Sequence, residues 1–152
     1  MTRHQETRHL PYDADLMFQV VSDVERYPEF LPWVLALRIK SRTQEGGREI
    51  LIAEMAVGYG ALRERYTSRV TIDPEAMSID VVEIAGPFKC LENHWRFTPE
   101  GEGSAVTFTI AFEFHNRLLQ LTAGKAFETV LLRMTDAFAA RAKALSEGAK
   151  TA

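Results

Sequence analysis

Residues 116–147 read NRLLQLTAGKAFETVLLRMTDAFAARAKALSE, and this stretch decides how the rest of the chain can fold. Its larger apolar side chains recur every three or four residues, the spacing of an amphipathic helix: Phe127, Val130, Leu131, Met134, Phe138, Ala142 and Leu145. Asn116 can cap the first turn, and Gly148 stands where a helix usually ends. Such a helix is roughly 45 Å long. Each large apolar side chain contributes about 1.5–3 kcal/mol when buried, so the helix needs a broad apolar surface to pack on.

The middle of the chain supplies that surface, because its apolar residues alternate with polar ones as they do in β-strands. The alternation is clearest over 62–72, where one face carries Leu62, Glu64, Tyr66, Ser68, Val70 and Ile72. Turns rich in glycine, aspartate and proline separate six predicted strands, over 35–40, 48–58, 62–72, 77–84, 88–97 and 106–114. Leu35, Leu37 and Ile39 form the apolar face of the first of these. Strands joined by tight turns pair antiparallel, so we expect a sheet with one apolar face.

The N-terminal part adds an edge strand over 3–10 and a short helix. Asp13 can cap that helix, whose apolar face carries Met17, Val20, Val21 and Val24. The helix must end near Pro28, since the residue before a proline is disfavoured in helical geometry. The segment that follows, YPEFLPW over 27–33, has two prolines and three aromatic rings. We expect a short helical turn or loop there, too apolar to be an ordinary exposed connection.

Composition favours one soluble domain over residues 1–152. The chain is 46% hydrophobic and 26% charged, with a net charge of −3, which argues against a general nucleic-acid-binding surface. The single cysteine, Cys90, excludes an internal disulfide and fits a reducing compartment. The N-terminus lacks the apolar core of a signal peptide, and no apolar run is long enough to span a membrane. We therefore expect a cytoplasmic protein, with any membrane contact peripheral and at the inner face of the plasma membrane.

Known catalytic and metal-binding patterns are missing from the sequence. The four histidines are scattered, Cys90 has no cysteine partner, and no G-x-S-x-G motif is present. His94 is expected to face outward with Glu92 and Arg96. We predict no metal, no cofactor and no enzymatic activity. Glu64 stays open, because strand alternation points this carboxylate inward. It can act as a general base or as a hydrogen-bond acceptor for a ligand. Alternatively, it is exposed to water at the open end of the fold or pairs with an arginine.

The inward-facing positions are unusually rich in aromatic rings. These rings can simply pack together as a core. A strongly curved sheet around one long helix, however, tends to leave a tunnel, and the small residues Ala123, Gly124 and Ala142 leave part of it unfilled. A pocket lined by rings with few polar groups is the usual form of a site for an apolar ligand.

Residues 22–33, SDVERYPEFLPW, resemble the DVxxYPxFLPW signature of the coenzyme Q-binding START-like family, part of the polyketide cyclase/dehydrase and lipid transport superfamily. Residues 66–70, 86–97 and 112–114 match further stretches of that family in the same order. The resemblance implies an α+β helix-grip fold, in which a curved antiparallel sheet of about seven strands wraps around a long C-terminal helix. It also implies binding of ubiquinone or a related isoprenoid lipid, as a non-catalytic carrier that supports respiratory electron transport.

The resemblance and the inward-facing pattern together give the candidate ligand-binding residues. The family signature places Tyr27, Phe30, Leu31, Pro32 and Trp33 at the cavity entrance, and Phe88, Leu91 and Trp95 in its wall. Strand and helix periodicity adds further inward positions: Val57, Tyr66, Phe112, Phe127, Leu131, Met134 and Phe138.

Two other functions remain open. The chain also resembles a ribosome-association toxin family, and a basic row on the outer sheet face can bind a ribosome or a respiratory complex: Arg38, Lys40, Arg63, Arg65 and Arg69. Alternatively, the protein is a polyketide cyclase- or dehydratase-like enzyme with Glu64 or Tyr66 as acid or base. The partners predicted are thus a polyprenyl quinone or other lipid, and a ribosome or respiratory complex, with no free nucleic acid expected.

Overall fold

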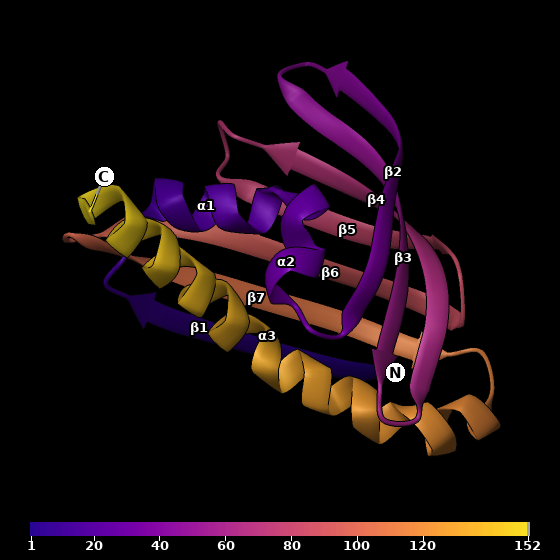
Figure 1. The fold of residues 1–152 in the computed structure, drawn as a ribbon. Helices are drawn as coiled ribbons and strands as arrows, with labels where there is room; N and C mark the ends of the chain where they lie inside the picture. The colour runs from indigo at the N-terminus through magenta and orange to yellow at the C-terminus, as the bar shows by residue number, and fades with distance from the viewer. Residues whose placement is uncertain (152) are drawn as a thin grey trace.

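The structure, a computed structural model, describes residues 1–151 and the side chains of residues 1–148. Seven strands form one antiparallel sheet in the order β1-β7-β6-β5-β4-β3-β2 (Figure 1). They are β1 (Thr2–Leu10), β2 (Val34–Glu45), β3 (Arg48–Tyr59), β4 (Leu62–Asp73), β5 (Ser78–Ala85), β6 (Phe88–Glu100) and β7 (Gly103–Phe114). The helices are α1 (Ala14–Ser22), the 3-10 turn η1 (Val24–Arg26), α2 (Tyr27–Phe30) and α3 (Arg117–Thr151). This is the predicted helix-grip architecture.

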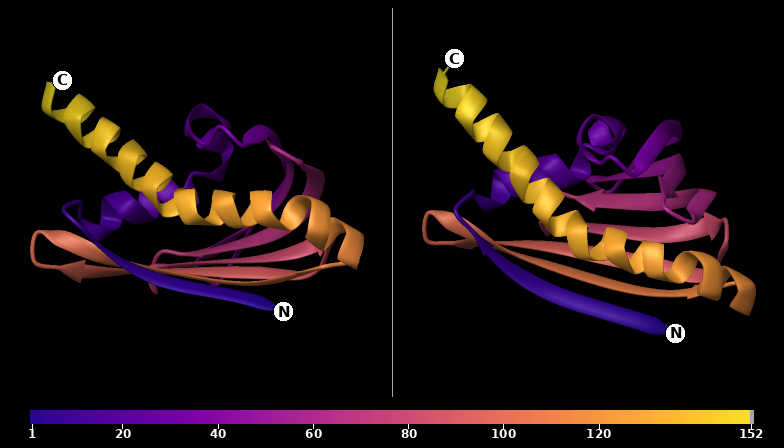
Figure 2. Two further views of the ribbon diagram at one scale, coloured as in Figure 1. Left: turned by 90° about the horizontal axis from the view of Figure 1, so that it is seen from below. Right: turned by 60° about the horizontal axis from the view of Figure 1, so that its bottom comes forward.

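All helices lie on the same face of the sheet. Figure 2 shows α3 crossing the concave face, with α1 and α2 beside its C-terminal half. The predicted caps are confirmed: Asp13 Oδ1 accepts a hydrogen bond from the backbone N–H of Leu16 at 2.7 Å, and Asn116 Oδ1 accepts one from Leu119 at 2.9 Å. Each cap satisfies a donor that the first helical turn would leave unpaired.

The apolar stripe of α3 is buried as the sequence predicts, except at Met134, which is half-buried, and at its end. Phe127, Val130, Leu131, Phe138 and Ala142 are all less than 10% exposed. Leu145 is 44% exposed, so its assignment to the core was wrong. The helix also continues to Thr151 instead of ending at Gly148. Figure 2 shows that the yellow end of α3 rises away from the sheet.

Edge strand β1 fixes the second half of α3. The hydroxyl of Thr135, a residue only 1% exposed, donates a hydrogen bond to the carboxylate of Glu6. One residue further along, Asp136 forms an ion pair with Arg8 at 2.7 Å. Because β1 pairs with β7 along its whole length, these two contacts connect the C-terminal helix to the chain's first residues.

The other side of α3 is held by an aromatic cluster. The rings of Tyr27, Phe30 and Phe138 meet edge to face, with centroids 5.3–6.0 Å apart. The Tyr27 hydroxyl donates to the carbonyl oxygen of Val21, which ties α2 to α1. Arg141 of α3 pairs with Glu29 at 3.0 Å and lies over the ring of Phe30. Segment 27–33 is therefore anchored to α3, and its first residues form the short helix α2.

A β-bulge in β2 changes which face of the sheet its first residues occupy, so the predicted face was partly wrong. Register shifts occur between Val34 and Ala36 and again between Ile39 and Ser41. The first shift turns Val34 inward, to pair with Val57, and leaves Leu35 58% exposed. Leu35 was therefore assigned to the wrong face, because a bulge changes which side of the sheet alternate residues occupy.

Gly86, in the turn between β5 and β6, is a position where only glycine fits. Its φ is +154°, and a Cβ there would lie 2.5 Å from Cβ of Tyr66 and 2.7 Å from Oε2 of Glu83. Gly101, in the β6–β7 turn, also has a positive φ of +59°, but nothing lies within 4 Å of its would-be Cβ.

We expect Gly86→Ala to lower the free energy of unfolding by about 2–5 kcal/mol, because backbone strain and a clash add together. Gly101→Ala should cost only about 1–2 kcal/mol from strain alone. Urea unfolding of both variants measures the difference. Equal losses of unfolding free energy in the two variants would show that the clash with Tyr66 and Glu83 does not contribute to destabilisation.

Candidate functional site

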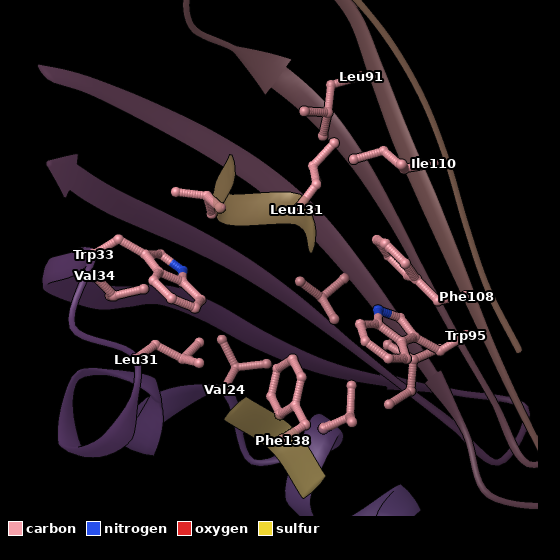
Figure 3. Close-up of a cluster of buried hydrophobic side chains, with 14 of the residues drawn as sticks. Val24, Leu31, Trp33, Val34, Leu91, Trp95, Phe108, Ile110, Leu131 and Phe138 are labelled. Atoms are coloured by element: carbon pink, nitrogen blue, oxygen red, sulfur yellow. The ribbon is translucent and has the colours of Figure 1, made fainter. Parts of the chain in front are cut away.

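A cavity of about 100 Å³ lies between the concave face of the sheet, α3 and the segment after α2. Figure 3 shows the side chains of Leu31 and Trp33, of Trp95 on β6, and of Leu131 and Phe138 on α3 converging around this region. Apolar atoms dominate its walls. Seven of its lining residues are only half-buried: Tyr27, Met55, Glu64, Tyr66, Val81, Asn93 and Met134.

Most of the predicted site residues line this cavity. They come from five elements and the α2–β2 connection: Tyr27, Leu31, Trp33, Val57, Tyr66, Phe88, Leu91, Trp95, Phe127, Leu131, Met134 and Phe138. The long helix contributes the same stripe that packs on the sheet. One surface of α3 therefore serves both the core and the cavity.

Three predicted residues lie outside the lining. Phe112 is 1% exposed and packs behind the wall, against the rings of Phe88 and Phe127. Phe30 lies in the seam between α2 and α3, under Arg141, and Pro32 is exposed in the turn before β2. For Phe112 the alternation gave the correct face but not the depth, because Phe88 and Phe127 cover its ring.

Several lining residues were not among the predicted set. The strands and α3 add Val34, Ala53, Met55, Leu62, Val70, Val81, Ile110 and Val130, and η1 adds Val24. Strand alternation was a sufficient signal for most of them, since each shares a face with a predicted neighbour. Val34 had no such signal, because the bulge that turns it inward is not visible as a sequence pattern.

The cavity also has a polar minority: Tyr27, Glu64, Tyr66, Ser68 and Asn93. Three of these are successive inward positions of β4, so the predicted inward orientation of Glu64 is confirmed. The Tyr66 hydroxyl donates only to the Sδ of Met55, at 3.4 Å. Among the side chains described, no carboxylate of the lining is hydrogen-bonded to a hydroxyl or amide of the lining. The cavity therefore lacks a preformed acid–base pair.

Both half-buried phenols of the lining are held in the neutral form. Burial, with the nearby charge of Glu83, raises the pKa of Tyr66 to about 12. Burial is also the main cause that raises the pKa of Tyr27, followed by the effects of Tyr66 and Asp23. At physiological pH both hydroxyls are hydrogen-bond donors and poor bases.

The outer face of the sheet carries the polar cluster expected around His94. His94 Nδ1 and Arg96 both contact Oδ1 of Asp80, at 2.6 and 3.0 Å. Burial alone would raise the pKa of Asp80, but these two hydrogen bonds and the charge of Arg96 hold it below its usual value. In the described part of the chain, no group of three or more His, Cys, Asp or Glu side chains is arranged to hold a metal ion. No helix among residues 1–151 is long and apolar enough to cross a membrane.

The family described as polyketide cyclase/dehydrase and lipid transport matches residues 10–139. The chain belongs to this family. Within it, the chain is 38% identical over 145 residues to a Pseudomonas aeruginosa protein named ribosome association toxin RatA, covering 95% of this chain and 97% of that one. It is 32% identical over 131 residues to the mitochondrial coenzyme Q-binding protein COQ10 of Drosophila melanogaster, covering 84% of this chain and 52% of that one.

Solved structures show the same architecture for this member of the polyketide cyclase/dehydrase and lipid transport family. The 18 kDa protein CC1736 from Caulobacter crescentus aligns with a TM-score of 0.80 and 39% identity, over 97% of this chain and 99% of that chain. The Zhui aromatase/cyclase from Streptomyces aligns with a TM-score of 0.80 over 93% of each chain. At 17% identity, the likeness to the aromatase/cyclase shows the fold alone.

Tyr66 gives a pH-dependent test of the cavity's burial. Between pH 10 and 12 the folded protein keeps the Tyr66 proton that the unfolded chain loses, so the free energy of unfolding falls as pH rises. Tyr66 alone contributes up to about 1.4 kcal/mol per pH unit to this fall. Tyr66→Phe should give a shallower loss of stability in urea titrations from pH 10 to 12. An identical slope in both proteins would contradict burial of this phenol.

Proposed function

We propose that this protein binds an isoprenoid quinone, ubiquinone or a close relative, in the cavity and carries it without chemical change in support of respiratory electron transport. The observation that supports this best is the lining itself, in which aromatic and branched side chains surround the space and polar groups are few. An isoprenoid quinone, a ring with a branched apolar tail, presents a surface of the same apolar character as this lining. The name of the fly relative, a coenzyme Q-binding protein, points in the same direction.

The size of the cavity limits how such a ligand can sit. An apolar cavity of about 150 Å³ is known to hold one benzene ring. The space of about 100 Å³ therefore suits a single ring only with some side-chain adjustment, and a polyprenyl tail must extend beyond it. Met55 and Met134 line the cavity and are only half-buried, and unbranched methionine side chains adapt to irregular ligands more easily than branched ones.

A carrier role accounts for the lack of catalytic groups better than an enzymatic one does. A polyketide cyclase- or dehydratase-like enzyme needs a base beside an acid, and the lining offers Glu64 and two neutral phenols with no hydrogen bond between them. We extend the proposal to location: the protein works in the cytoplasm and meets its ligand at the inner face of the plasma membrane.

Filling the cavity should abolish quinone binding. Ala53 lines it at 3% exposure, whereas Ala56 on the same strand pairs with Arg65 on the outer face. A short-chain ubiquinone with a decyl tail should quench the fluorescence of Trp33 and Trp95, both lining residues, in a saturable way. We expect Ala53→Phe to lose this quenching and Ala56→Phe to keep it. Equal quenching in the two variants would show that the quinone binds elsewhere.

A second candidate function is association with the ribosome, favoured by the relatives of that name and by the outer face of β4. Arg63, Arg65 and Arg69 are all exposed there. The guanidinium of Arg63 lies over Gly58, where a Cβ would come within 2.1 Å of its nitrogen. The negative charge of Glu54 on β3 partly offsets the positive charge of this row, and Glu54 forms an ion pair with Arg38 at 3.6 Å. A row of exposed cations of this kind suits the phosphates of ribosomal RNA.

Reversing the row tests this second function. Arg63→Glu, Arg65→Glu and Arg69→Glu together should lower co-sedimentation with ribosomal subunits by about tenfold or more at 50–100 mM salt, because phosphate contacts are lost. The matched control reverses three exposed cations on α3: Arg117, Lys125 and Lys143. If both triple variants co-sediment like the wild-type protein, the β4 row is not the contact.

A further inference from the structure

Buried side-chain polar atoms without a hydrogen-bond partner occur at three places in the described part of the chain: Ser68 Oγ, Glu83 Oε2 and His4 Nε2. Two of them belong to residues that pair directly across β4 and β5, Ser68 and Glu83. Of the three residues, Ser68 lines the cavity. Buried polar groups are nearly always hydrogen-bonded, so two orphaned atoms on neighbouring residues need an explanation.

Ser68 sits within a larger polar group on the cavity wall. Tyr66 occupies the next inward position of β4. Among the described residues, its hydroxyl donates a hydrogen bond to the sulfur of Met55 alone. Asn93 on β6 also lines the cavity, and its amide forms no hydrogen bond or ion pair with another described side chain. The carboxylate of Glu83 lies against Gly86, beside Tyr66. Unused donors and acceptors therefore surround one stretch of an otherwise apolar wall.

Packing does not account for this arrangement. Ser68 is 4% exposed, and an alanine would fill the same place without an unpaired hydroxyl. Its neighbours in the lining, Val70 and Val81, are apolar, so the wall itself does not require polarity there. An unpaired buried hydroxyl costs stability in the free protein, and a bound group that hydrogen-bonds to it removes that cost.

We infer that Ser68, with Tyr66 at the next inward position of β4 and Asn93 across β5 on β6, is the subsite that recognises the oxygen atoms of a ring-shaped ligand head group. The hydroxyls of Ser68 and Tyr66 and the amide of Asn93 all offer hydrogen-bond donors, which suit the carbonyl oxygens of a quinone. Glu83 borders the subsite behind Ser68. Burial raises the pKa of its carboxyl, against the opposing effects of the Phe88 backbone N–H and of His115.

This inference rests on the proposed carrier function, and it fixes the ligand's orientation. The oxygenated ring lies against the polar side chains of β4 and β6 inside the cavity, and the apolar tail points away from them. A ligand without ring oxygens would occupy the same space but leave the polar group unsatisfied. The subsite therefore distinguishes quinones from hydrocarbons and simple acyl chains of the same size.

A pair of probes of nearly equal size isolates the oxygen contacts. Duroquinone and durene have the same four-methyl ring, and only duroquinone carries two carbonyl oxygens. Titration of isotope-labelled protein, followed by nuclear magnetic resonance, gives a Kd for each probe. We expect the wild-type protein to prefer duroquinone. Ser68→Ala and Asn93→Leu should each weaken duroquinone binding by about 3–10-fold, the value of one neutral hydrogen bond, with durene changed less than twofold.

Controls separate this inference from the proposed function. Thr67→Val, on the outer face of the same strand, should change neither Kd. Ser68→Ala should melt no lower than the wild-type protein, since no hydrogen bond within the described chain is lost. If both probes bind the wild-type protein but duroquinone and durene weaken equally in the variants, or bind equally well at the start, the subsite is wrong and the carrier role stands. If neither probe binds, both proposals are overturned.

Discussion

Burial of α3 against a curved sheet is the constraint on which the rest of this structure depends. The helix presents one continuous apolar stripe, and only a concave surface can cover it from Ala123 to Ala142. The chain meets this need with seven strands and then fixes the helix from two sides. On one side, β1 contacts Thr135 and Asp136; on the other, α2 contacts Phe138 and Arg141. These attachments lie in the second half of the helix. Near its start, Phe127 instead packs among Phe88, Phe112 and Phe114.

The cavity follows from that geometry, because the middle of α3 spans the sheet without filling the space beneath it. Rings meet edge to face around the gap, as in the contacts of Trp95 with Phe138 and of Tyr66 with Phe88. Rigid aromatic side chains support one another but do not collapse into a void as flexible ones do. An unfilled apolar space costs stability, on the order of 24 cal/mol per Å³ in a well-studied series of core truncations. In a member of a lipid transport family, a space of this kind supports the ligand site proposed above.

The sequence predicted the fold well because periodicity and turn chemistry are local signals. Both helix caps, all the strands and the face of Glu64 followed from the residues at those positions. The errors arose where tertiary geometry intervened. A bulge changed the faces of Leu35 and Val34, the end of α3 that carries Leu145 rises away from the sheet, and neighbouring rings separate Phe112 from the cavity. Alternation gives the side of a sheet that a residue faces, but neither its depth nor the distance to the element opposite. The same limit applies to Ser68, whose inward face was predictable and whose missing partner was not.

The two candidate functions use opposite faces of one strand. On β4, Glu64, Tyr66 and Ser68 point into the cavity, whereas Arg63, Arg65 and Arg69 point to solvent. Adjacent residues of a strand face opposite sides, so a ligand inside and a partner outside do not compete for the same atoms. A chain can therefore combine a carrier's cavity with a contact surface for a larger partner, and the relatives with different names need not differ in fold. If the two sites do influence each other, the effect must be reciprocal: a ligand that strengthens the outer contact is itself held more tightly when that contact forms. Strand β4 is the shortest physical path between them, and its register shift at Thr67 and Ser68 lies directly beside the polar part of the cavity wall.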